Sequence, residues 1–173
     1  LSVLGYLQTL SGAHRALVIH GNYLADEDVA FLTEHADRMA VVYCPRTHAF
    51  FQHDPYPLEK LLAAGVGVAL GTDSRASSPD LSMLAEMREV HRRHPGIEPG
   101  TLVRLATLGG ATALGQQHRL GAIELGRRAD LIAVALPEEA GATTDPYRWL
   151  LESDTPVVAV WCGGRPIISQ EHD

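Results

Sequence analysis

The chain has 173 residues, of which 46% are hydrophobic and 20% are charged, so its composition is that of a globular domain and excludes a disordered chain. The net charge of −7, without any run of Lys or Arg, argues against nucleic acid or an anionic membrane surface as the main partner. No apolar stretch is long enough to span a bilayer. Cys44 and Cys162 lie far apart in apolar runs, as buried thiols in a reducing compartment do, and we therefore expect a cytoplasmic location.

The first half of the sequence alternates buried strands with helices. Apolar residues at helical spacing open the chain at 3–7, which predicts that it starts inside a helix and is the C-terminal piece of a longer protein. Further along, the predicted strands are 16–19, 39–44 and 65–70, the predicted helices are 26–36 and 57–64, and the predicted loop is 46–56. Three strand–helix units in series with crossover connections favour a parallel sheet or part of a barrel.

The second half of the sequence changes first to helices and then to short strands. Ser78 is expected to cap a helix with Pro79 at its first position, and a second helix is expected from about Pro99. The predicted strands that follow are 121–126, 129–134, 156–162 and 165–168, the last two as a hairpin around Gly163-Gly164.

Polar side chains follow each of the three predicted parallel strands. His20 follows the first strand, Arg46 and His48 follow the second, and Asp73 follows the third. The carboxyl ends of parallel strands meet at one rim, where α/β proteins place their active sites. An imidazole and a carboxylate that converge there suit a divalent metal and also suit acid–base chemistry. On the residues alone, His20 and Asp73 could equally cap the loops that follow their strands.

Three motifs and the tail of the chain resemble a known family. The motifs are Val-Ile-His-Gly-Asn-Tyr-Leu at 18–24, Tyr-Cys-Pro-Arg-Thr-His-Ala-Phe-Phe at 43–51 and Leu-Gly-Thr-Asp-Ser at 70–74. Together with residues 120–131, they look like the last strand-end motifs of the amidohydrolase superfamily, in its aminohydrolase and chlorohydrolase branch of nucleoside, guanine and cytosine-type deaminases. The second motif is also similar to sequences near the aminofutalosine deaminases.

The resemblance implies an α/β fold, namely the last three βα units of a metal-dependent hydrolase TIM barrel followed by a small terminal β-sandwich. The barrel part with two extra helices would cover 1–118 and the sandwich 119–173. Asp73 matches the aspartate that binds one catalytic divalent metal, most often zinc, with iron or manganese as alternatives, and that shuttles a proton. His20 matches a histidine beside the hydrolytic water that is a direct metal ligand in two-metal relatives. Arg46, His48 and Ser74 match the region that contacts substrate.

The resemblance also implies a function: hydrolysis of a C–N bond in a small amino-substituted heterocycle, nucleoside-like or base-like, by metal-activated water. The alternatives are hydrolysis of a ring amide or a carbon–halogen bond on the same scaffold, and a non-catalytic half-barrel module. The family's His-x-His and its further histidine have no counterpart here. A catalytic zinc site needs about three protein ligands, so we expect this piece alone to be inactive. Three barrel strands leave an open edge, and we expect the piece to form a homo-oligomer or to aggregate.

Overall fold

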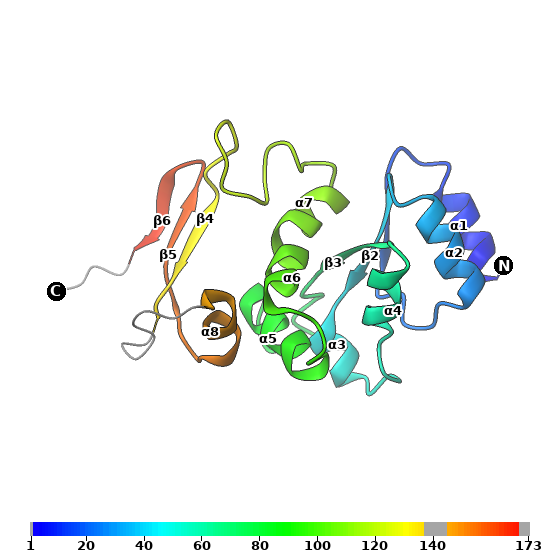
Figure 1. Ribbon diagram of the computed structural model, residues 1–173, viewed down its shortest axis with the longest axis horizontal. Helices are drawn as coiled ribbons and strands as arrows, with labels where there is room; N and C mark the ends of the chain where they lie inside the picture. Colours follow the sequence, from blue (N-terminus) through cyan, green and yellow to red (C-terminus); the bar gives the residue numbers. More distant parts are fainter. Residues whose placement is uncertain (1, 137–144, 170–173) are drawn as a thin grey trace.

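A parallel three-stranded sheet forms the centre of the larger part of the molecule (Figure 1). The computed structural model describes residues 2–136 and 145–169. Strands β1 (Ala16–Ile19), β2 (Met39–Tyr43) and β3 (Gly67–Leu70) lie in that order, each parallel to the next. Their carboxyl ends therefore share one edge, as the sequence predicted.

Helices pack around this sheet and lead from one strand to the next. They are α1 (Val3–Leu10), α2 (Asp26–Glu34), α3 (Pro45–Phe50), α4 (Leu58–Ala63), α5 (Met83–Arg93), α6 (Pro99–Arg104), the π-helix η1 (Leu105–Gly109), α7 (Gly110–Ala113) and α8 (Pro146–Glu152). The segments α6, η1 and α7 follow one another without a break, and η1 and α7 pack on β3. Gly109 permits this contact, because a Cβ there would lie 2.9 Å from the carbonyl oxygen of Val68. In the described part of the chain, no helix has the length and apolar character needed to cross a membrane.

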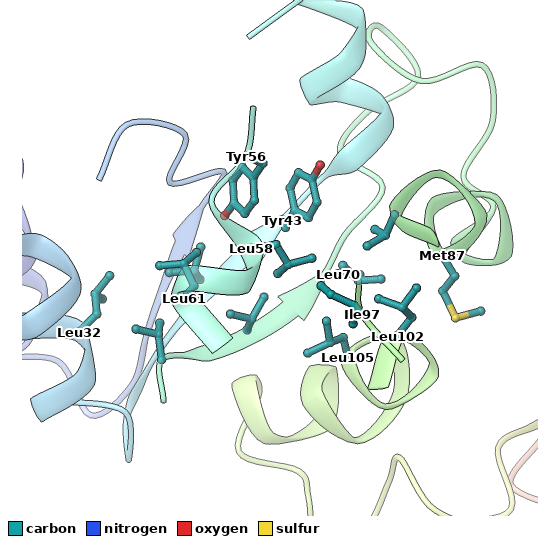
Figure 2. Packing of buried hydrophobic residues seen from close by; sticks show 14 of the residues in the cluster. Leu32, Tyr43, Tyr56, Leu58, Leu61, Leu70, Met87, Ile97, Leu102 and Leu105 are labelled. Atoms are coloured by element: carbon teal, nitrogen blue, oxygen red, sulfur yellow. The ribbon is translucent and has the colours of Figure 1, made fainter. Parts of the chain in front are cut away.

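The hydrophobic core lies between the parallel sheet and the helices that follow it (Figure 2). Leu58 and Leu61 of α4 and Leu102 of α6 are fully buried there. Tyr43 at the end of β2 stacks on Tyr56, with ring centroids 3.8 Å apart and the planes 8° from parallel. This stack lies directly below the rim of the sheet and gives the residues after β1 and β2 a rigid support.

Three sequence predictions of local structure were wrong. Residues 46–56 do not form one loop, because Pro45 occupies the first turn of α3, a position where its missing N–H costs nothing. The helix α5 is capped by Ser82, whose side chain accepts a hydrogen bond from the N–H of Ala85, and not by Ser78. Residues 121–126 form turns and bends in place of a strand.

An antiparallel sheet lies at the opposite end of the molecule from α1 (Figure 1). It contains β4 (Leu131–Val134), β5 (Val157–Cys162) and β6 (Arg165–Ser169), and the predicted hairpin between the last two is confirmed. Arg88 of α5 ties this region to the helices, because its guanidinium donates to the carbonyls of Leu150 and Thr155. The described residues after 118 form only this one sheet, so a terminal β-sandwich and a domain boundary at 118/119 remain predictions.

Candidate metal and substrate site

His20 and Asp73 meet at the carboxyl edge of the parallel sheet. His20 directly follows β1 and Asp73 follows β3, and the His20 Nε2 atom lies 3.9 Å from Asp73 Oδ2. Both side chains are about one-third exposed, at 37% and 32%. The pair is therefore held by the sheet and still open to a ligand, which is the arrangement that the strand-end pattern predicted.

Both residues adopt a backbone conformation that is rare for side chains other than glycine. The φ angle is +67° at His20 and +56° at Asp73. Such left-handed residues cost energy and persist where the surrounding structure holds them, often at functional sites. One such support is visible at His20, whose carbonyl oxygen accepts a 2.7 Å hydrogen bond from the hydroxyl of Tyr56. The stacked tyrosines thereby fix the turn that carries the imidazole.

A pair of buried hydroxyl groups orients the Asp73 carboxylate. Ser77 Oγ donates to Asp73 Oδ2 at 3.1 Å. Because that donation uses the only hydroxyl hydrogen of Ser77, the 2.9 Å contact between Thr47 Oγ1 and Ser77 Oγ has Thr47 as the donor. Ser78 Oγ donates in turn to the carbonyl of Thr72. The first turn of α3 and the loop after β3 thus hold Asp73 together.

His48 lies in the wall of a small cavity beside His20. The cavity has a volume of about 120 Å³ and is lined by His20, Asn22, Thr47, His48, Phe51 and His53. His48 is only 4% exposed, and neither of its ring nitrogens has a hydrogen-bond partner of normal geometry among the described residues. Burial, helped by nearby His53, lowers the pKa of His48. The imidazole is therefore neutral at neutral pH.

Arg46 points away from His20 and Asp73, although it belongs to the same motif as His48. Its Nε donates to Glu86 Oε1 at 2.7 Å and its backbone N–H donates to Glu86 Oε2 at 3.0 Å. The terminal Nη2 group of Arg46 donates to Oδ1 of Asp80 at 2.7 Å. The Glu86 side chain is fully buried, and burial raises its pKa against the opposing effect of Arg46. Arg46 thus fastens α3 to α5, a role that differs from the substrate contact the motif predicts.

Ser74 and Cys44 are neighbours of the site without lining its cavity. Ser74 is exposed, and its Oγ accepts a hydrogen bond from the N–H of Ala76 in the turn after Asp73. Cys44 is buried at the end of β2, and burial together with the nearby Asp73 charge raises the pKa of its thiol to about 11. Cys44 is therefore the inert buried thiol that the sequence predicted.

The sequence analysis missed the residues that support the site. Ser77 and Tyr56 are ordinary loop residues in the sequence, and no spacing pattern links Thr47 to Ser77 thirty positions later. The weak signal available for Ser77 is its position four residues after Asp73, within one turn of chain. The structure also places His53, from the loop after α3, in the wall of the cavity.

The residues at the rim fit two ligands of a divalent metal site. An imidazole nitrogen and a carboxylate oxygen are the donor types that zinc accepts, and here both belong to rigidly held strand ends. Within residues 2–136 and 145–169, no group of three or more His, Cys, Asp or Glu side chains is placed to hold a metal. The described residues therefore provide a partial donor set.

Comparison with known proteins finds deaminases. The chain is 37% identical over 125 residues to the 5-methylthioadenosine/S-adenosylhomocysteine deaminase of Moorella thermoacetica, a match that covers 68% of this chain and 29% of that protein. It is 33% identical over 160 residues to the deaminase of the same description from Teredinibacter turnerae, covering 87% of this chain and 36% of that protein. The chain thus spans about a third of the length of these curated relatives.

Comparison with solved structures finds the same fold in larger proteins. An adenosine deaminase from Xanthomonas campestris, solved with bound zinc, superposes with a TM-score of 0.86 at 30% identity, covering 98% of this chain and 42% of that one. Atrazine chlorohydrolase from Arthrobacter aurescens, complexed with zinc, superposes with a TM-score of 0.80 at 24% identity, covering 91% of this chain and 37% of that one.

Both superpositions cover more than 90% of this chain but only about two-fifths of the solved chain, which is consistent with a part of a TIM barrel. The sequence profile described as the amidohydrolase family matches residues 5–167, which is nearly the whole chain. The chain therefore belongs to the amidohydrolase family.

Proposed function

We propose that the protein containing this chain is a metal-dependent hydrolase that deaminates an amino-substituted heterocycle. The observation that carries the proposal is the His20–Asp73 pair, 3.9 Å apart at the carboxyl rim with both backbones in left-handed conformations. Strained, rigidly supported polar residues at this rim mark active sites more often than structural ones. Family membership and deaminase relatives supply the reaction class.

His20 and Asp73 would hold one divalent metal together with ligands from outside the described residues. Zinc is the ion we propose, because zinc accepts mixed imidazole and carboxylate donors and is bound in the solved relatives. When bound, such an ion lowers the pKa of a water molecule toward roughly 7, so that hydroxide is available at neutral pH.

The residues of this chain then perform the proton transfers. Asp73 accepts a proton from the attacking water and passes it to the leaving ammonia, while Ser77 keeps the carboxylate in the required orientation. The ring N–H of His20 that does not face the metal would donate a hydrogen bond to the negative charge that develops on the substrate. The strand ends keep these groups in fixed positions, which is the main requirement for efficient transfer.

His48 and Ser74 remain proposed substrate contacts. His48 lies in a cavity beside His20, and Ser74 lies on the exposed turn directly after Asp73. Arg46 is better placed to position α3 than to contact substrate, because its guanidinium is held by Glu86 and Asp80. The substrate class we propose is an adenosine-like nucleoside, in keeping with the deaminase relatives. The cytoplasmic location and the oligomeric state stay predictions.

The test uses the longest natural protein that contains this sequence, loaded with zinc. Ammonia release is measured with adenosine, 5′-methylthioadenosine, S-adenosylhomocysteine and guanine, for the wild type and for Asp73→Ala. We expect turnover of at least one nucleoside and its loss in the variant at unchanged circular dichroism. Halide release from a chlorinated triazine without deamination would instead favour the carbon–halogen hydrolase. Unchanged turnover in Asp73→Ala would refute the proposed role of this residue.

A further inference from the structure

The cavity beside His20 is lined by a buried imidazole that has no well-formed hydrogen bond to the described residues. His48 is only 4% exposed, and neither Nδ1 nor Nε2 has a hydrogen bond of normal geometry to the described residues. A buried polar group of this kind is rare, because leaving it unsatisfied costs free energy. On the same cavity wall, Thr47 donates its hydroxyl hydrogen to Ser77, and His53 Nδ1 is bonded to the Tyr23 hydroxyl at 2.8 Å. His48 meets the backbone of Asp54 only in a contact without normal hydrogen-bond geometry, so a ligand in the cavity can supply the partner that its ring lacks.

The composition of the wall determines what kind of group can enter. The six lining residues include no Lys or Arg, so a bound anion would find no fixed positive charge. The Asp73 carboxylate lies 3.9 Å from Nε2 of His20, which lines the cavity, and its negative charge disfavours a bound anion further. Burial, together with His53 and Arg93, lowers the pKa of His48, which keeps this imidazole uncharged. A neutral imidazole offers one donor and one acceptor, and a hydroxyl group matches both.

From this arrangement we infer that the cavity lined by His20, Asn22, Thr47, His48, Phe51 and His53 is a specificity subsite that receives an uncharged sugar hydroxyl of the substrate. The inference rests on the proposed function, because it assumes that the amino-substituted ring binds at His20 and Asp73. The volume of about 120 Å³ accommodates a small substituent of the substrate. Phe51, which is exposed, contributes an apolar ring to the lining of the cavity.

The experiment compares matched substrates and matched variants of the zinc-loaded, longest natural protein that contains this sequence. The substrates are adenosine, 2′-deoxyadenosine, 3′-deoxyadenosine and 9-methyladenine. The variants are His48→Phe, which keeps the ring shape and removes both nitrogens, and His48→Asn, which keeps one donor and one acceptor. His94→Gln is the stability control, since His94 is buried, bonds to Glu59 and does not line the cavity.

We expect the wild type and His94→Gln to discriminate against one deoxynucleoside by about 10- to 100-fold in kcat/KM. His48→Phe should lose that discrimination by turning over adenosine less well, while the deoxynucleoside is affected little. His48→Asn should recover part of it. A purely structural role for His48 would lower kcat/KM for all four substrates equally and would overturn the inference. Equal use of all four substrates by the wild type, as for a cavity that holds only water, would overturn it as well.

Failure of the proposed function gives a different result. If no substrate is deaminated but the nucleosides bind, the same comparison is made on dissociation constants from isothermal titration calorimetry. Discrimination that depends on His48 then supports the subsite while the deaminase proposal falls. If neither turnover nor binding is found with any of the four compounds, both proposals are refuted.

Discussion

Replacing Arg46 with Ala would leave the fully buried carboxylate of Glu86 without its charged partner. Breaking a buried ion pair in this way costs about 3–5 kcal/mol. The Arg46 backbone N–H, 3.0 Å from Glu86 Oε2, remains in the variant and offsets part of the loss. Asp80 adds little, because its side chain is 52% exposed. We therefore expect a loss of about 3 kcal/mol, the lower end of the range.

The assay is urea unfolding followed by circular dichroism, with Arg148→Ala as the matched control. Arg148 also pairs with a glutamate, but its side chain is 66% exposed and that of Glu152 is 45% exposed, so little loss of stability is expected. The double variant Arg46→Met with Glu86→Leu should regain most of the stability, because no buried charge is left unpaired. A loss in Arg46→Ala no larger than that in Arg148→Ala would refute the structural role of Arg46.

The pH dependence of this loss has a defined sign. Burial already raises the pKa of Glu86 in the folded protein above its usual value of 4.5, and removal of Arg46 raises it further. A carboxyl group with a raised folded pKa favours the folded state at low pH and disfavours it as pH rises. The destabilisation by Arg46→Ala should therefore shrink as the pH is lowered toward 4. A loss that grows on acidification would contradict the assignment.

Two further predictions concern the site itself. Ser77→Ala removes the donor to Asp73 Oδ2 and should weaken zinc binding by the longest natural protein about 10- to 100-fold. The control Ser82→Ala removes only a helix cap, so it should cost about 1 kcal/mol of stability and leave zinc binding unchanged. Equal zinc binding in both variants would show that Ser77 does not orient the metal ligand. His48 has a folded pKa below its usual 6.5, so its neutral form contributes stability that is present above pH 6.5 and is lost as pH falls through the folded pKa. Unfolding free energies of the wild type should fall more steeply below pH 6.5 than those of His48→Phe, and parallel curves would rule this contribution out.

The sequence predicted the parallel sheet and the His20–Asp73 pair because both depend on local pattern. Each strand is an apolar run that ends at a polar residue, and register in a parallel sheet brings such ends to one edge. The start of α3 is hard to recognise in the sequence because Pro45 directly follows a strand, although proline also suits the first turn of a helix.

The supports of the site could not be predicted in the same way. The contacts of Thr47 with Ser77, of Arg46 with Glu86 and of Tyr56 with the His20 carbonyl join residues 30 to 40 positions apart. Nothing in a single sequence records which hydroxyl or guanidinium meets which acceptor across such a distance. The motif around Arg46 and His48 places both residues near the rim, and only the packing of α3 on α5 shows that Arg46 turns to Glu86 while His48 turns to the cavity.

The most direct test of the account is zinc titration of the longest natural protein that contains this sequence, by competition with a chelating dye, for the wild type and for Asp73→Asn. The substitution preserves shape and removes the charge of the proposed ligand. We predict one tightly bound zinc in the wild type, and a loss of affinity in the variant that exceeds the roughly 10- to 100-fold typical of residues that only support a ligand. One equivalent of zinc bound with unchanged affinity by Asp73→Asn would contradict the assignment of Asp73 as a metal ligand.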